Sequence, residues 1–116
     1  MLNFPLSPSR NTNGLVFISG QIGQQDGQLV SDDIEGQLIQ TVKNIATILE
    51  ANSLTLGNVV DVTAFLVDQN DYNIFNEVYT KEFQKPYPAR TTVTVKSLPL
   101  EAKVELKVIA SRGEIT

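Results

Sequence analysis

The chain has 116 residues, a length that fits one domain with an ordinary hydrophobic core. Thirteen acidic against nine basic residues give a formal charge of −4, and no Lys or Arg cluster stands out, which disfavours nucleic-acid binding. Because the chain has neither Cys nor His, disulfides, thiol nucleophiles, Ser-His-Asp triads and thiolate- or imidazole-held metals are excluded. Any chemistry must use carboxylates, Arg, Lys, Tyr, Ser, Thr, backbone amides and water.

The N-terminal segment, residues 1–13, is rich in Pro, Ser and Asn and has room for a short edge strand at most. It lacks the apolar stretch of a signal peptide, and no run of roughly 18 apolar residues follows, so we expect a cytoplasmic protein without membrane contact. Residues 15–22 are β-rich and follow the turn pair Asn13-Gly14, which predicts a hairpin. A second turn, Asp26-Gly27, lies within residues 24–30.

Two helices and a central strand are predicted in the middle of the chain. The first helix runs from Asp32, which forms a capping-box pattern with Glu35, to Asn52. Residues 58–67 are a β-branched run that is apolar on both faces, as in a central strand. The second helix runs from Asn70 or Asp71 to Phe83, before Pro86 and Pro88. The apolar stripes of the two helices are Ile34, Leu38, Val42, Ile45 and Leu49, then Tyr72, Phe75, Tyr79 and Phe83.

The last third predicts two strands, residues 90–96 and 103–110, paired as a hairpin with Lys96 opposite Lys103. This register places the valines of both strands on the core face. The resulting order, β-β-α-β-α-β-β, predicts an α+β domain with two helices covering one face of the sheet. Another subunit could cover the opposite face, which carries Thr, Lys and a few apolar residues.

In that register Arg90 and Glu105 share the non-core face, separated by about four residues, on the order of 13 Å. They could flank a small ligand, serve different sites across an interface, or be solvated surface charges. At Ser19-Gly20, a strand end without a Cβ allows backbone amides to approach a ligand, although a β-bulge has the same pattern. Asn76 taken alone is an ordinary polar helix position.

Several short motifs appear in order along the chain: Ile18-Ser19-Gly20-Gln21-Ile22, Asn76-Glu77-Val78-Tyr79, Pro88-Ala89-Arg90-Thr91, Leu98-Pro99 and Val104-Glu105-Leu106. Together they resemble the Rid family, the RidA-type reactive intermediate (enamine/imine) deaminases, and the similarity extends from about residue 5 to residue 110. The resemblance implies a chorismate-mutase-like fold and a homotrimer with its clefts between subunits. It also implies cofactor-independent hydrolysis of 2-aminoacrylate and related 2-imino acids, such as 2-iminobutanoate and 2-iminopropanoate, to 2-oxo acids and ammonia.

The resemblance also assigns roles to individual residues. Arg90 is implied to bind the substrate carboxylate, as a guanidinium does well, and Glu105 to act on the attacking water. The other substrate-binding positions are Ser19, Gly20, Thr92, which stands where the family often has cysteine, and Asn76, which the neighbouring subunit is implied to contribute. No metal site is expected.

The start of the chain departs from the family pattern, because Leu6 replaces a pocket tyrosine. The loss of that hydroxyl and aromatic face would alter substrate range or turnover. Two other functions therefore stay open: an endoribonuclease activity attributed to some relatives, against which the acidic charge and the absence of His argue, and a non-catalytic module that binds small carboxylates.

Overall fold

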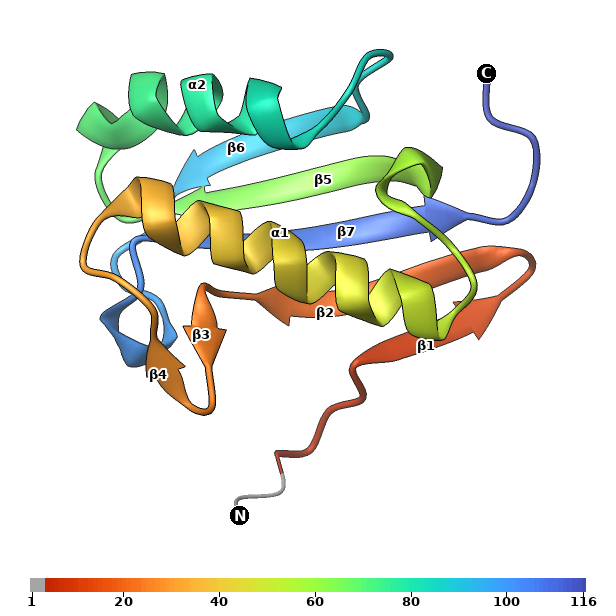
Figure 1. The fold of residues 1–116 in the computed structure, drawn as a ribbon, viewed down its shortest axis with the longest axis horizontal. Coiled ribbons are helices and arrows are strands. Elements are labelled where there is room, and N and C mark those ends of the chain that lie inside the picture. The colour runs from red at the N-terminus through yellow and green to blue at the C-terminus, as the bar shows by residue number, and fades with distance from the viewer. Residues whose placement is uncertain (1–3) are drawn as a thin grey trace.

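A five-stranded mixed sheet carries two helices on one face in the computed structural model, which describes residues 4–116 (Figure 1). The sheet order is β1-β2-β7-β5-β6, and a separate two-stranded hairpin, β3-β4, precedes the first helix. The elements are β1 (Ser9–Thr12), β2 (Leu15–Gln21), β3 (Gln24–Gln25), β4 (Gln28–Leu29), α1 (Ile34–Ala51), β5 (Val59–Leu66), α2 (Tyr72–Glu82), β6 (Ala89–Thr94) and β7 (Val104–Ser111), with short 3₁₀ helices η1 (Leu56–Asn58), η2 (Gln69–Asp71) and η3 (Pro99–Glu101). The predicted α+β class with both helices on one face is confirmed.

Both predicted turns form. Asn13 and Gly14 have φ values of 50° and 79° and join β1 to β2, whose end residues Thr12 and Leu15 are paired. Two consecutive positive φ angles fit a type I′ hairpin, for which Asn-Gly is favoured. The Asp26-Gly27 turn, with φ values of 54° and 82°, closes the β3-β4 hairpin in the same way. β1 lies at the sheet edge, as expected for the N-terminal segment; residues 1–3 of that segment lie outside the described part.

The first helix begins one residue later than the capping-box pattern indicates. Asp33, not Asp32, is the N-cap, and its carboxylate accepts a hydrogen bond from the Gly36 N–H at 2.7 Å. Asp33 rather than Asp32 caps the helix because the Asp33 carboxylate reaches the Gly36 amide directly. The predicted stripe of five apolar residues in α1 is buried against the sheet. Within residues 4–116, no helix combines the length and the apolarity needed to cross a membrane.

The predicted hairpin between the last two strands is wrong, because β5 lies between β6 and β7. β6 runs parallel to β5, with Arg90 opposite Val62, and β7 runs antiparallel to β5, with Val108 opposite Val62. Alternation along a strand defines its two faces but not its neighbour. The crossover through α2 returns the chain parallel to β5, as helical crossovers do, and β7 takes the other side of that apolar central strand.

The predicted facing of β6 is also wrong. Arg90 and Thr92 align with Val62 and Ala64, which are buried under the helices, whereas Val93 lies on the open face and is 40% exposed. The two faces of an edge strand rich in Thr differ little in polarity. Packing against the aromatic side chains of α2 therefore determines which face of β6 is covered. Glu105 lies opposite Phe65 on the open face. Arg90 and Glu105 of one chain therefore point to opposite sides of the sheet.

Candidate functional site

Arg90 is held against α2 by a hydrogen bond and by aromatic rings. Its Nη2 donates to Asn76 Oδ1 at 2.7 Å and lies 3.4 Å from the Tyr72 hydroxyl. The guanidinium carbon lies 4.7 Å from the centre of the Tyr79 ring, 5.1 Å from that of Phe75 and 6.0 Å from that of Tyr72. These helical residues lie three or four positions apart and so share one face. Cation–π contacts of this kind favour a fixed guanidinium plane.

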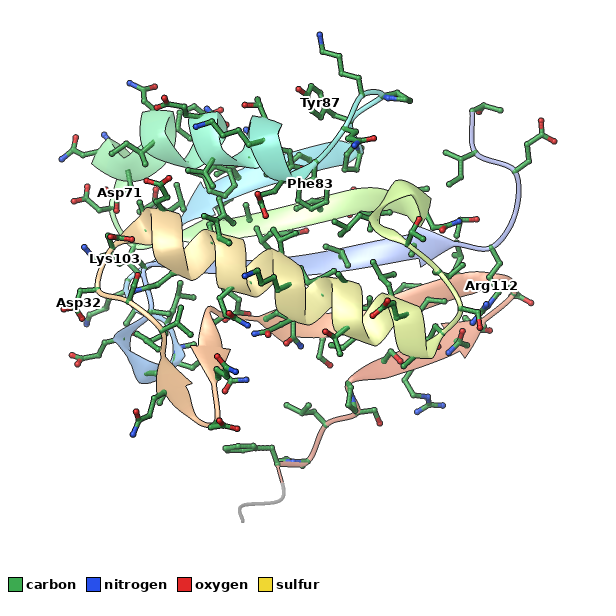
Figure 2. The ribbon with its side chains drawn as sticks, in the orientation of Figure 1. Asp32, Asp71, Phe83, Tyr87, Lys103 and Arg112 are labelled. Carbon is green, nitrogen blue, oxygen red and sulfur yellow. The ribbon has the colours of Figure 1, made fainter. Side chains whose placement is uncertain are left out.

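Tyr79 lies at the centre of an aromatic column beneath this cation. Its ring stacks on Phe83 at 4.5 Å and lies 5.6 Å from Phe75 and 6.4 Å from Tyr87. Figure 2 shows Phe83 and Tyr87 at the end of α2 and in the loop that leads to β6. Burial raises the pKa of Tyr79 to about 12, and the nearby Arg90 opposes this shift. The Tyr79 phenol is therefore neutral at physiological pH and offers the cation an aromatic face.

We expect the Tyr79 ring, rather than its hydroxyl, to position Arg90. The hydroxyl is buried and has no hydrogen-bond partner among residues 4–116, so Tyr79→Phe should retain carboxylate affinity. Tyr79→Leu removes the cation–π contact and should weaken binding of a 2-oxo acid by about five-fold, or about 1 kcal/mol. Isothermal titration with pyruvate measures both variants. Equal affinity of the Leu and Phe variants would contradict this role for the ring.

A second cluster lies on the open face, where Glu105 of β7 meets the end of β2. The pairing of β2 with β7 shifts register between Ile18 and Gln21, so Ser19-Gly20 forms a bulge. A Cβ on Gly20 would collide with the Glu105 carboxylate, coming within 2.9 Å of its Cδ and closer to Oε2. Partial burial raises the pKa of Glu105. Ser19-Gly20 is therefore both a β-bulge and part of the candidate site, because the glycine makes room for the Glu105 carboxylate.

The N-terminal segment is tied to this cluster through Ser19. The Ser19 hydroxyl donates to the Ser7 carbonyl at 2.6 Å, and its N–H donates to the Pro8 carbonyl at 3.0 Å. Leu6, one residue before Ser7, is 63% exposed, and no part of its side chain supplies the hydroxyl of the family tyrosine. Lys107 lies two residues beyond Glu105 on the same strand and so on the same face, and its Nζ lies 3.4 Å from the Ile18 carbonyl.

Substitution of Gly20 should affect activity more than folding. In Gly20→Ala the new Cβ displaces the far end of a flexible Glu105 side chain, which can rotate away, rather than any backbone atom. We expect kcat to fall by about ten-fold or more if Glu105 handles the proton of the attacking water, while thermal unfolding stays close to that of the parent. Gly57→Ala, where a Cβ meets only Thr55 Oγ1 at an ordinary 3.5 Å, is the matched control. Full activity of Gly20→Ala would contradict the assignment.

The structure thus divides the sequence-predicted residues into two half-sites. The arginine half-site holds Arg90, Asn76 and the half-buried Thr92, whose buried Oγ1 has no partner within residues 4–116. The glutamate half-site holds Glu105, Ser19 and Gly20 on the other face of the sheet. Asn76 therefore lies with Arg90 in one subunit, which differs from its implied place on a neighbour. Among the described residues, no three Asp or Glu side chains gather in a group that fits a metal ion.

Comparisons with known proteins identify the family. The family model described as Endoribonuclease L-PSP matches residues 3–112. A chloroplastic Reactive Intermediate Deaminase A of Arabidopsis thaliana is 41% identical over 109 residues, which are 92% of this chain and 58% of the relative. The human 2-iminobutanoate/2-iminopropanoate deaminase is 37% identical over 114 residues, 97% of this chain and 83% of that protein. The chain thus spans less than two thirds of the Arabidopsis protein.

A solved structure agrees with these sequence matches. The crystal structure of E. coli TdcF with bound serine superposes with a TM-score of 0.88 at 33% identity, covering 97% of this chain and 91% of that one. The fold is therefore that of the reactive intermediate deaminases. The chain belongs to the Endoribonuclease L-PSP family, which is the RidA/YjgF family, as its motifs indicated.

Proposed function

We propose that this chain is a cofactor-independent hydrolase that converts 2-iminobutanoate, 2-iminopropanoate and their enamine forms to 2-oxo acids and ammonia. The observation that carries the proposal is the fixed guanidinium of Arg90, held by Asn76 at 2.7 Å and by aromatic rings at the sheet edge. A planar guanidinium binds a carboxylate through two parallel hydrogen bonds. The human relative named 2-iminobutanoate/2-iminopropanoate deaminase supports the substrate class, and the Arabidopsis relative named Reactive Intermediate Deaminase A supports a deaminase.

The proposed site is composite, and lies between two subunits of a homotrimer. Within one chain, the arginine half-site and the glutamate half-site lie on opposite faces of the sheet. Cyclic assembly repeats one interface around the ring, so the arginine half-site of one subunit can meet the glutamate half-site of the next three times. The substrate carboxylate would bind Arg90, and Glu105 of the neighbouring subunit would face the imine carbon.

The proposed reaction needs only positioned water and proton transfer. Glu105 accepts a proton from water as the water oxygen bonds to C2 and the C=N electron pair moves to nitrogen, and Glu105 then returns this proton to the nitrogen. Glu105 next transfers the hydroxyl proton of the tetrahedral carbinolamine to its amino group, which leaves as ammonia while the C2=O double bond forms, giving the 2-oxo acid. A partly buried carboxyl with a raised pKa is suited to accept and return this proton. Arg90 contributes orientation, which is the main requirement for so reactive a substrate.

A coupled assay tests the activity. A threonine or serine dehydratase generates the imine, and oxo-acid formation is followed with and without this protein. We expect the oxo acid to appear faster with the protein present. No acceleration with several imino acids, together with retained pyruvate binding, would instead favour the non-catalytic carboxylate-binding module.

Subunit mixing tests the composite site. Arg90→Ala and Glu105→Gln chains, each with little activity alone, are unfolded together at equal amounts and refolded. Mixed trimers hold one intact site in three, so activity should return to about a quarter of the parental value, because about three quarters of random trimers are mixed. A site built within one chain would regain nothing. Sedimentation should give about three times the chain mass of 12.8 kDa, and a monomer at micromolar concentration would contradict the trimer.

A further inference from the structure

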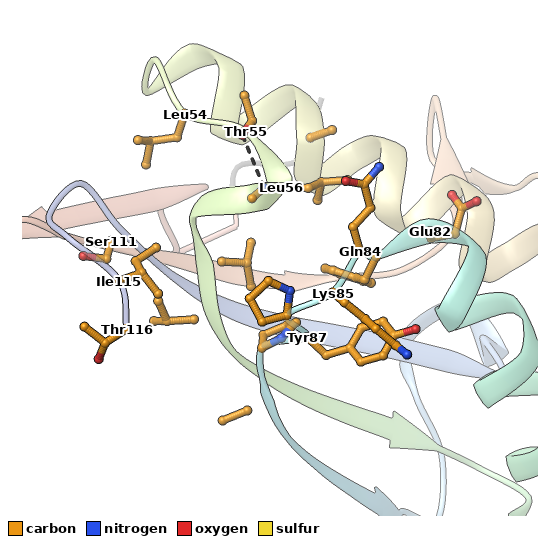
Figure 3. A pocket seen from close by; sticks show the side chains of 18 of the residues that line it. Leu54, Thr55, Leu56, Glu82, Gln84, Lys85, Tyr87, Ser111, Ile115 and Thr116 are labelled. Atoms are coloured by element: carbon orange, nitrogen blue, oxygen red, sulfur yellow. Dashed lines mark hydrogen bonds between the residues drawn. The ribbon is translucent and has the colours of Figure 1, made fainter.

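A groove of about 1080 Å³ lies at the end of the sheet away from the glutamate half-site (Figure 3). It lies between the C-terminal end of α1 with η1, the loop from α2 to β6, and the C-terminal segment that follows β7. Its walls are mainly apolar, formed by Leu54, Leu56, Phe83, Pro86, Tyr87 and Ile115. Arg90, Asn76, Glu105 and Ser19 do not line it. The groove is therefore separate from the residues of the proposed deaminase site.

The charged side chains that line the groove are mostly negative. Three carboxylates, those of Glu50, Glu82 and Glu114, belong to its lining, against the single ammonium of Lys85. The side chains of Glu50, Lys85 and Glu114 are exposed and that of Glu82 is half-buried, so the charges lie toward the margin of the groove while the apolar residues form its walls. An apolar cavity with a few charged groups at its margin is the usual form of a small-molecule site, and complementary charge selects the ligand.

The walls of the groove are held in place by contacts independent of any ligand. Thr55 and Asn58 form a capping box around η1, with the Thr55 N–H donating to Asn58 Oδ1 at 3.0 Å. On the opposite wall, Phe83 is 3% exposed and stacks on Tyr79 with ring centres 4.5 Å apart. A preformed wall loses little freedom on binding, which favours affinity for a small ligand.

From these observations we propose that the groove binds a small organic cation with an apolar body, such as an aromatic or long-chain amine. The hydrocarbon part lies against Leu56, Tyr87 and Ile115, and the ammonium group lies near the carboxylates of the rim. This ligand is opposite in charge to the imino acids proposed for Arg90, so the inference goes beyond the proposed function and does not rest on it.

Binding of the fluorescent amine dansylcadaverine to the intact protein tests the proposal. We expect saturable binding at one site per chain with blue-shifted emission, and about ten-fold weaker binding of the neutral dansylamide. Pyruvate in excess should not displace the amine, because the two ligands occupy different sites. The proposal is overturned if the amine does not bind, if pyruvate displaces it, or if the neutral probe binds equally well.

Two kinds of variant test whether the probe binds in this groove. Gly57 lines the groove, and a Cβ there meets only Thr55 Oγ1 at 3.5 Å, so Gly57→Phe should fill the groove and reduce affinity at least ten-fold, with Gly57→Ala as its matched control. Should Gly57→Phe not fold, the triple variant of Glu50, Glu82 and Glu114 to Gln leaves the walls intact. It should lose the preference for the amine over dansylamide, whereas Glu35→Gln, outside the groove, should keep it. Unchanged preference in the triple variant would overturn the proposal.

Discussion

Arg90→Ala should lower kcat/KM for imine hydrolysis by about two orders of magnitude or more. Each of the two charge-assisted hydrogen bonds to a carboxylate contributes about 1.5–3 kcal/mol, so the pair contributes about 3 kcal/mol or more, and each 1.36 kcal/mol is about ten-fold in rate. Arg90→Lys should restore only part of this loss, because an ammonium keeps the charge but loses the planar fork. The dehydratase-coupled assay measures both variants, with Arg10→Ala, an exposed arginine of the edge strand β1, as the matched control.

The fold should tolerate these changes at Arg90. The side chain is half-buried at a sheet edge and contacts α2 through its guanidinium end, so its removal opens no cavity in the core. Thermal unfolding and sedimentation verify that each variant keeps the parental assembly. A trimeric Arg90→Ala protein that hydrolyses imines at the parental rate would contradict the carboxylate-binding role of this residue.

Glu105→Gln should separate catalysis from binding. The amide keeps the shape of the side chain but cannot accept the proton of the attacking water, so kcat should fall by about 10²- to 10⁴-fold. Pyruvate affinity should stay within about three-fold of the parent, because the carboxylate binds Arg90 and not Glu105. Glu101→Gln, an exposed glutamate in η3, is the control. Parallel loss of kcat and of pyruvate binding would show that Glu105 holds the site together rather than acting on water.

The pH dependence of kcat gives an independent measurement of the same residue. A general base must be ionised, so activity falls as pH drops through its pKa. Burial raises the pKa of Glu105 above its ordinary value of 4.5, which moves the acid limb of the profile above that pH. The enzymatic rate, corrected for spontaneous imine hydrolysis, should therefore decline at a higher pH than an exposed glutamate would cause. An acid limb at or below the ordinary value would contradict the burial of this carboxyl.

Much of the architecture could be predicted from local pattern alone. The β-rich run at residues 15–22, the helical stripes and the Asn-Gly turn each predict an element whose type the structure confirms, because side-chain spacing and backbone preference act over a few residues. The family motifs also singled out the residues of both half-sites. They did so through resemblance, since the alternation alone left Arg90 and Glu105 equally explicable as surface charges.

The neighbours and facing of β6 were decided only by the tertiary structure. Its alternating Thr and Val residues leave both faces similar in polarity, so the pattern could not exclude the hairpin with β7 or the placement of Arg90 on the same face as Glu105. The crossover through α2 puts β6 parallel to β5, and the rings of Phe75 and Tyr79 then receive the guanidinium on the helical face. Pairing partners and buried cations depend on contacts between distant segments, which periodicity along one strand does not encode.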